Sequence, residues 1–280
     1  MAPQFSVVIP TFGRPAFLAE AVASVLAQTV TDIECIVVDD ASPEPASLPD
    51  DPRTHLIRRA TNGGPPAARN TGVDAARGRY VAFLDDDDVW TPYRLELAIE
   101  AHARAPVAVC WQGTLGDSTG TPHGRTLEGD VRDIVLDGMI PHLGTTSIER
   151  EHVVRFDERY QASDDIDWWL RVAQALRVAT TPRVGLLYRY HAEPRTRTSQ
   201  RVRIDNAQTL MREHADWFRA HPRAAAFRLD RMGLSALLVQ DRALALRCFT
   251  RSFRLHPDAR TAWHALRSLA AARPGKVPAS

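Results

Sequence analysis

The stretch that decides the fold is Gly78-Arg79-Tyr80-Val81-Ala82-Phe83-Leu84-Asp85-Asp86-Asp87-Asp88. Its first part, residues 79–84, is short and apolar, which predicts a buried strand, and four carboxylates follow directly. Four neighbouring negative charges repel one another and cannot be buried without a neutralising group. Oxygen ligands arranged in this way suit a hard divalent cation, Mg²⁺ or Mn²⁺, which in turn can bind a diphosphate. An acidic surface turn is the alternative.

Similar strands recur through the first two-thirds of the chain. Strands are predicted at residues 5–10, 34–38, 55–57 and 185–190, and helices at residues 15–28, 66–76 and 164–176. This alternation is typical of an α/β domain with a parallel sheet. Polar residues follow the strands at Pro10-Thr11, at Asp39-Asp40 and in the aspartate run. Because the carboxyl ends of parallel strands lie along one edge, where open α/β folds bind ligands, we expect these groups to converge.

Composition places the chain among soluble globular proteins. Its 280 residues are 44% hydrophobic and 25% charged, which is enough for a large core. The longest apolar runs are too short to span a bilayer, and the N-terminus lacks the pattern of a signal peptide. Three cysteines without metal-ligand spacing argue against a disulfide framework. We therefore expect a cytoplasmic protein, and no aromatic–basic motif predicts nucleic-acid binding.

Charge divides the chain into two parts. Residues 1–194 carry 18 basic and 28 acidic groups, whereas residues 195–280 carry 17 basic and 6 acidic groups. Residues 113–139 are polar and rich in turn residues, which predicts a weakly structured insertion or a small antiparallel portion. Residues 195–200 lack apolar side chains and predict a mobile connector. Residues 204–273 are predicted to be helical, and residues 274–280 disordered.

Seven segments in order resemble the family 2 glycosyltransferases. They are Ser6-Val7-Val8-Ile9-Pro10-Thr11-Phe12, Ile36-Val37-Val38-Asp39-Asp40-Ala41-Ser42, Ala68-Arg69-Asn70-Thr71-Gly72, the stretch Gly78 to Asp88, Phe156-Asp157-Glu158, Asp164-Asp165-Ile166-Asp167-Trp168-Trp169-Leu170-Arg171 and Tyr188-Arg189-Tyr190-His191. The resemblance implies a GT-A fold: a mixed, mainly parallel α/β sheet flanked by helices, here with a C-terminal helical extension. It implies a catalytic domain over residues 1–203, with a donor-binding part at about 1–110 and an acceptor-side part at about 111–203.

The resemblance also implies an inverting transfer of a sugar from a nucleotide-diphosphate sugar, with a UDP-sugar favoured. Mn²⁺ or Mg²⁺ would offset the charge on the leaving diphosphate. Asp85 and Asp87 match the Asp-x-Asp positions as metal ligands, and Asp86 is expected near the ribose. For Asp88 a metal role, an electrostatic role and a helix-capping role stay open. His191 is expected at the metal or the diphosphate, with a loop histidine without function as the alternative.

The nucleoside is expected at the ends of the first two strands. Pro10 and Thr11 would contact it there, and Asp40 is assigned to the base; a strand-end turn is the alternative. Arg69 matches a position that approaches the nucleotide, and its guanidinium suits phosphate. A structural ion pair between Arg69 and the acidic edge is the competing explanation. The polar residues from 195 to 199 would form a flexible lid.

Inversion requires a general base that deprotonates the acceptor hydroxyl. The resemblance places it in an acidic pair at a helix start, here Asp164 and Asp165, and Asp165 is assigned as the base. The usual pair is Glu-Asp, so Asp164 is a departure, and helix N-capping is its alternative role. Trp168 would stack on a sugar or belong to the core. His142 is expected on the acceptor side.

Two other functions stay open. A nucleotidyltransferase also uses carboxylate-held Mg²⁺, but it usually has a Gly-rich loop with a Lys where this chain has Pro10-Thr11-Phe12-Gly13-Arg14. A catalytically inactive scaffold with a recruiting helical tail is the second. Residues 229–269 faintly resemble one tetratricopeptide-type pair, which cannot bury its own face, so we expect a homodimer through these helices. The acceptor is an undetermined glycan, lipid-linked or small molecule, and membrane contact would be peripheral at most.

Overall fold

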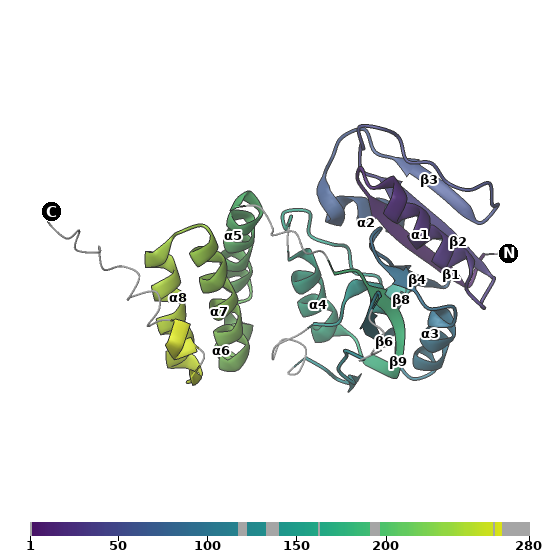
Figure 1. Ribbon diagram of the computed structural model, residues 1–280. Helices are drawn as coiled ribbons and strands as arrows, with labels where there is room; N and C mark the ends of the chain where they lie inside the picture. The colour runs from purple at the N-terminus through teal and green to yellow at the C-terminus, as the bar shows by residue number, and fades with distance from the viewer. Residues whose placement is uncertain are drawn as a thin grey trace, which may run out of the picture. The chain divides into compact units, whose positions relative to one another are not determined.

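The computed structural model describes residues 2–116, 122–132, 140–161, 163–190, 197–259 and 261–264. The chain forms two compact units (Figure 1). The first unit comprises residues 1–135 and 140–192, and the second comprises residues 136–139 and 193–280. The tail expected to be disordered, residues 274–280, lies outside the described residues.

A mixed sheet forms the centre of the first unit. Its strands are β1 (Phe5–Thr11), β2 (Ile33–Asp39), β3 (Thr54–Arg58), β4 (Tyr80–Phe83), β5 (Val89–Trp90), β6 (Val107–Thr114), β7 (Glu128–Gly129), β8 (Thr146–Glu149) and β9 (Val178–Tyr188). Their spatial order is β3-β2-β1-β4-β8-β6-β9-β5, with β7 beside β9. The first four strands are parallel, and β8 runs antiparallel between β4 and β6. This arrangement confirms the mixed, mainly parallel sheet.

Helices cover both faces of this sheet. They are α1 (Pro15–Leu26), α2 (Gly64–Ala75), α3 (Arg94–His102) and α4 (Asp164–Ala175). Successive strand side chains point to opposite faces: Val7 packs in one apolar cluster with residues of α1 and α3, whereas Val8 faces Gly72 of α2. Phe83 of β4 meets Trp168 of α4 edge-on, with ring centroids 5.8 Å apart. The strands are therefore buried on both sides, as their continuous apolar runs predict.

Two predicted boundaries differ from the structure. Strand β9 begins at Val178, seven residues before the predicted start, because Thr180 and Thr181 are buried with their hydroxyls bonded to Leu127 O and Leu97 O, both at 3.0 Å. Within residues 113–139, the described part contains β7, which pairs antiparallel with β9. The second of the two alternatives for this segment is thus the one observed. Two short 3₁₀ turns, Leu143–Thr145 and Arg150–His152, flank β8.

The second unit is helical in the part that the structure describes. It contains α5 (Arg197–Glu213), α6 (Ala215–Ala220), α7 (Pro222–Leu238) and α8 (Arg242–Leu255). Helices α7 and α8 pack closely, because Gly233 offers no Cβ to the ring of Phe249, which would lie 2.6 Å from one. Of the mobile or ligand-ordered connector predicted at residues 195–200, the part from Arg197 onward is the first turn of α5. Among the described helices, none combines the length and the apolar character that crossing a membrane requires.

Candidate functional site

Three polar strand ends meet at one edge of the sheet. Strand β1 lies between β2 and β4, and all three are parallel, so Thr11, Asp39 and the aspartate run share this edge. The Thr11 hydroxyl donates to Asp86 Oδ2 at 2.7 Å, which joins the ends of β1 and β4 directly. The expected convergence of the polar strand ends is therefore observed, and a hydrogen bond joins the ends of β1 and β4.

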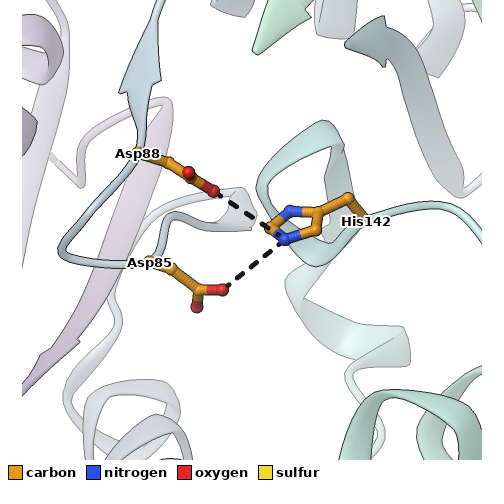
Figure 2. A group of neighbouring side chains, drawn as sticks. All are labelled: Asp85, Asp88 and His142. Carbon is orange, nitrogen blue, oxygen red and sulfur yellow. Dashed lines mark ion pairs between the residues drawn. The ribbon is translucent and has the colours of Figure 1, made fainter. Parts of the chain in front are cut away.

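Asp85 and Asp88, the first and last residues of the aspartate run, form a group with His142. These three residues are the inner group. Figure 2 shows Asp85 and Asp88 facing His142, whose Nε2 lies 3.7 Å from Asp85 Oδ2 and 3.8 Å from Asp88 Oδ2. Asp88 is buried, its Oδ1 accepts from the backbone N–H of Arg189 at 2.9 Å, and its Oδ2 has no hydrogen-bond partner among the described residues. Burial, and then the charge of Asp85, raise the pKa of Asp88 to about 8. The inner group thus holds a buried carboxylate with one oxygen that accepts no hydrogen bond from the described residues.

The imidazole of His142 has a defined orientation. Its Nδ1 accepts from the backbone N–H of Gly144 at 3.1 Å, so in the neutral ring the proton sits on Nε2 and points toward the two carboxylates. In this tautomer His142 is a hydrogen donor at the aspartate run; it would bind a cation through Nε2 only after the contact with Gly144 opens. Sequence reasoning placed His142 on the acceptor side, and the structure places it at the inner group.

A divalent cation fits the inner group by the chemistry of its donors. The ligand atoms of Asp85, Asp88 and His142 all lie within 4.8 Å of one another. Carboxylate oxygens are ligands that Mg²⁺ and Mn²⁺ prefer. The unpartnered, buried Oδ2 of Asp88 is the kind of atom that a bound ion would satisfy. The residues present therefore fit the metal that the aspartate run predicted.

The two central residues of the aspartate run, Asp86 and Asp87, pair with Arg14, which the sequence did not assign to the site. Their carboxylates are the outer carboxylates. Arg14 Nη1 lies 2.5 Å from Asp87 Oδ2, and Arg14 Nη2 lies 3.4 Å from Asp86 Oδ1. Asp86 is buried, and burial raises its pKa to about 6, although Arg14 and Thr11 oppose this rise. Asp87, predicted as a metal ligand, thus has an arginine on its carboxylate. The sequence feature that could have indicated this ion pair is the basic residue that follows the first strand.

Arg69 connects the aspartate run to the acidic pair. Its Nη2 lies 2.6 Å from Asp85 Oδ1, and its Nη1 lies 2.5 Å from Asp164 Oδ2. Burial opposes the charge on Asp85, but Arg69 and His142 hold the pKa of this carboxyl below its ordinary value. Burial raises the pKa of Asp164 to about 6, against the effect of Arg69. Of the two explanations for Arg69, the structure shows the ion pair with the acidic edge.

The acidic pair begins helix α4. The residue before the helix is Ser163, with φ of 94° and no capping hydrogen bond from its side chain, so Asp164 is the first helical residue rather than the N-cap. Asp164 is buried and turned to Arg69, whereas Asp165 is half-buried and its Oδ1 accepts from Ile166 N at 2.9 Å. The two neighbouring carboxylates therefore differ in environment: Arg69 binds the first, and the second keeps an exposed part.

The carboxylate of Asp40 organises the start of α2. It accepts from the backbone N–H groups of Gly63 and Gly64, at 3.1 and 2.7 Å, and pairs with Arg59. The negative charge lies where the helix N-terminus carries partial positive charge. Asp40 and Pro10 are both buried at the ends of their strands. Their predicted contacts with a nucleoside stay predictions.

Three expectations require correction or fall outside the described residues. Trp168 has no exposed surface, stacks on Phe156 with centroids 5.5 Å apart, and donates to Val154 O, so it belongs to the core and offers no face to a sugar. Asp88 does not cap a helix, because α3 begins at Arg94 and its N-cap is Tyr93. His191 lies outside the described residues, as does the start of the predicted lid.

Comparison with known proteins agrees with this architecture. The family model described as Glycosyl transferase family 2 matches residues 6–162. The succinoglycan biosynthesis proteins ExoW and ExoO of Rhizobium meliloti (strain 1021) are 42% and 41% identical over 122 and 103 residues; these matches cover 40% and 35% of this chain and 38% and 29% of the relatives. The chain thus spans about a third of the length of these curated relatives.

Solved structures share the fold. S. aureus TarS has a TM-score of 0.61 at 17% identity, covering 93% of this chain and 50% of that one. The mannosyltransferase PcManGT from Pyrobaculum calidifontis, solved with GDP-Man and Mn²⁺, has a TM-score of 0.60 at 18% identity, covering 97% and 81%. These likenesses confirm the GT-A fold expected from the sequence. Because the family match covers more than half of the chain, this protein belongs to glycosyl transferase family 2.

Proposed function

We propose that the protein is an inverting glycosyltransferase that moves a sugar from a nucleotide-diphosphate sugar to an acceptor hydroxyl, assisted by Mn²⁺ or Mg²⁺. The observation that carries this proposal is the double ion pair of Arg69, which holds Asp85 of the aspartate run and Asp164 of the acidic pair on one guanidinium. One arginine side chain thus holds the aspartate run, suited to a cation, close to the acidic pair, suited to supply a base. A direct displacement requires such groups to be positioned close together.

The donor would bind along the strand ends. Asp85 and Asp87, with Asp88 behind them, would hold the cation, which supplies positive charge for the leaving diphosphate. Asp86 and Thr11, already bonded to each other, would accept the ribose hydroxyls. Pro10 and Asp40 would contact the base from the adjacent strand ends. None of these donor roles uses the half-buried Asp165, which follows the Asp164 that Arg69 binds.

Asp165 would act as the general base. Its carboxylate would take the proton of the acceptor hydroxyl while that oxygen attacks the anomeric carbon, and the bond from this carbon to the diphosphate oxygen would break on the opposite face. Asp164 forms an ion pair with Arg69, so the carboxylate of Asp165 would be the one that accepts the proton of the acceptor hydroxyl. Inversion at the anomeric carbon follows from this single displacement.

Two substitutions separate the proposed roles. Asp165→Asn should reduce transfer by about 10²- to 10⁴-fold, the range for a lost general base, with donor affinity nearly unchanged. Asp87→Ala should instead lose metal-dependent nucleotide binding. Calorimetric titration with UDP and Mn²⁺, together with turnover of a UDP-sugar, measures both. Normal turnover of Asp165→Asn would exclude it as the base.

The base of the donor nucleotide is proposed to be uracil. TarS has been solved with UDP and with UDP-GlcNAc, and PcManGT with GDP-Man, so both bases occur on this fold. A thermal-shift series with UDP, GDP and their sugars, with and without Mn²⁺, decides between them, because a ligand that binds only the folded state raises the melting temperature. A protein that responds to none of these would favour the inactive scaffold.

We further propose that the helical unit mediates homodimerisation. Its described helices expose large apolar side chains: Leu238 is 61% exposed and Phe253 is 41% exposed. A single helical pair of the tetratricopeptide type cannot bury its own apolar face, and these side chains are the proposed part of that face.

A further inference from the structure

Arg14 stands directly on the outer carboxylates of the aspartate run. It follows β1 across the turn at Gly13, whose φ of 67° favours glycine and whose N–H donates to Ser42 Oγ at 2.9 Å. This turn aims the guanidinium back at the sheet edge, where it pairs with Asp87 at 2.5 Å and with Asp86 at 3.4 Å. The side chain is nevertheless 47% exposed.

The two arginines on the aspartate run differ in how firmly they are held. Arg69 is buried between two carboxylates on two different elements, so it is part of the framework. Arg14 is about half exposed and, within the described part of the chain, forms ion pairs with Asp86 and Asp87. A partly exposed guanidinium on a loop exchanges partners at low cost, because water and other anions compete for it. Arg14 is therefore the cation that an incoming ligand can displace.

Two parts of the proposed donor complex compete for this ion pair from opposite sides. In the proposed function the divalent cation takes Asp87 as a ligand, and Arg14 covers that carboxylate. A guanidinium there repels the cation, because like charges repel at this distance. A diphosphate needs a guanidinium, which matches its oxygens in a bidentate fork. Each ligand therefore prefers the state in which Arg14 has left Asp87.

We propose that Arg14 is an exchangeable counter-ion: it neutralises Asp86 and Asp87 before the donor binds and transfers to the donor diphosphate when the cation enters. The inference rests on the proposed function and deepens it. Arg14 thereby couples two binding events, since nucleotide that draws the guanidinium away frees carboxylate oxygen for the cation. By linkage, the cation must strengthen nucleotide binding by the same factor.

The test measures Mn²⁺ affinity with and without UDP, by titration calorimetry or by the paramagnetic signal of free Mn²⁺. The proteins are the full-length wild type, Arg14→Gln, Arg14→Lys and a matched control, Arg183→Gln. The control removes an exposed arginine in the middle of β9 that pairs with Glu100 of α3. Melting curves verify that all four are folded.

Arg14→Gln should bind Mn²⁺ alone about 3- to 10-fold more tightly than the wild type, because one competing positive charge is gone. The same variant should bind UDP in saturating Mn²⁺ about 10-fold more weakly, because a charge-assisted bond to the diphosphate is lost. Opposite signs for the two ligands are a result that a structural defect would not produce. Arg14→Lys should fall between, and Arg183→Gln should match the wild type.

Two outcomes overturn the proposal, and they can be told apart. If the wild type binds Mn²⁺ and UDP or GDP but Arg14→Gln leaves both affinities unchanged, or weakens both, the counter-ion role fails while the proposed function stands. If the wild type binds neither Mn²⁺ nor either nucleotide, the proposed function fails and the role of Arg14 falls with it.

Discussion

Asp88 carries a carboxylate oxygen without a hydrogen-bond partner on a side chain that is only 1% exposed. Burial of such a carboxyl costs folding free energy, since desolvation disfavours the ionised form and raises the pKa of Asp88 to about 8. Proteins retain such groups where a ligand supplies the missing partner. Asp88 therefore lowers the stability of the ligand-free protein, and a bound divalent cation would restore what it lost.

Replacing Asp88 by Asn should stabilise the metal-free protein by about 1 kcal/mol, the usual gain from removing an unfavourable group. The amide keeps the acceptor for Arg189 N and removes the charge. The same variant should lose most of the rise in melting temperature that Mn²⁺ gives the wild type. Thermal melts with and without Mn²⁺ check both effects, and an unchanged response to Mn²⁺ would exclude Asp88 from the cation site.

At the level of single residues, the sequence identifies groups that are adjacent in the chain but not those brought together by folding. The aspartate run and the acidic pair were evident, because four and two carboxylates stand together. His142 lies far from Asp85 in the chain, and no spacing rule links them; the antiparallel insertion of β8 brings the preceding loop to the run. Arg14 escaped notice because a single arginine after a strand has many ordinary uses.

Among the elements, α2 depends on its close approach to β1. A Cβ on Gly72 would lie 2.3 Å from Val8 Cγ1, a distance that real contacts do not show. An alanine in place of a helical glycine normally gains up to about 1 kcal/mol, but overpacking a core costs about 1–3 kcal/mol. The clash is the larger effect, so Gly72 is required by packing and holds Arg69 at its place.

We therefore expect Gly72→Ala to lower the free energy of unfolding by about 1–3 kcal/mol. Val8→Ala alone should also destabilise, because it leaves a cavity. The double variant should be more stable than the sum of the two changes, since each relieves the other. Urea denaturation of the four proteins measures this coupling, and simple additivity would show that Gly72 and Val8 do not limit each other.

His102, the last residue of α3, introduces a pH dependence. Its ring stacks on Tyr80 at 4.0 Å, its Nε2 lies 3.0 Å from Ser147 Oγ, and burial lowers its pKa to about 3. Between pH 3 and about 6.5 the unfolded chain therefore binds a proton that the folded chain does not, so this residue costs stability as pH falls through 6.5.

The wild type should accordingly lose about 2 kcal/mol through this residue between pH 7 and pH 5. His102→Gln, which can keep a bond to Ser147, should show a flatter dependence whatever its stability at pH 7. Guanidinium denaturation at pH 5, 6 and 7 gives the two slopes. Equal slopes would mean that His102 is protonated in the folded protein.

The elements were predictable where side chains repeat with a clear period. Val7-Val8-Ile9 and Ile36-Val37-Val38 mark strands buried on both faces, and the structure has β1 and β2 there. The start of β9 was missed because Thr180 and Thr181 read as polar although their hydroxyls are satisfied inside. Tertiary hydrogen bonds of this kind leave no periodic trace in a sequence.

On the scale of the whole molecule, the second unit contains the helices α5 to α8. Homodimerisation through this region is tested with Leu238→Ser combined with Phe253→Ser, which removes two exposed apolar side chains. We expect the wild type to elute as a dimer and the double variant as a monomer in size-exclusion chromatography with light scattering. Leu56→Ser, on exposed β3, is the matched control, and a monomeric wild type would end the proposal.

The place of β8 in the sheet has a consequence for how the chain is made. Strand β4 ends at Phe83 and β6 begins at Val107, yet the strand between them starts only at Thr146. During synthesis, β4 therefore waits with an open edge while more than sixty further residues emerge, and open edges invite pairing with other chains. Residues 1–110 alone would keep that edge bare, so this fragment should aggregate when it is expressed by itself. The charged run at the end of β4 is well placed to keep the nascent edge soluble until β8 closes it.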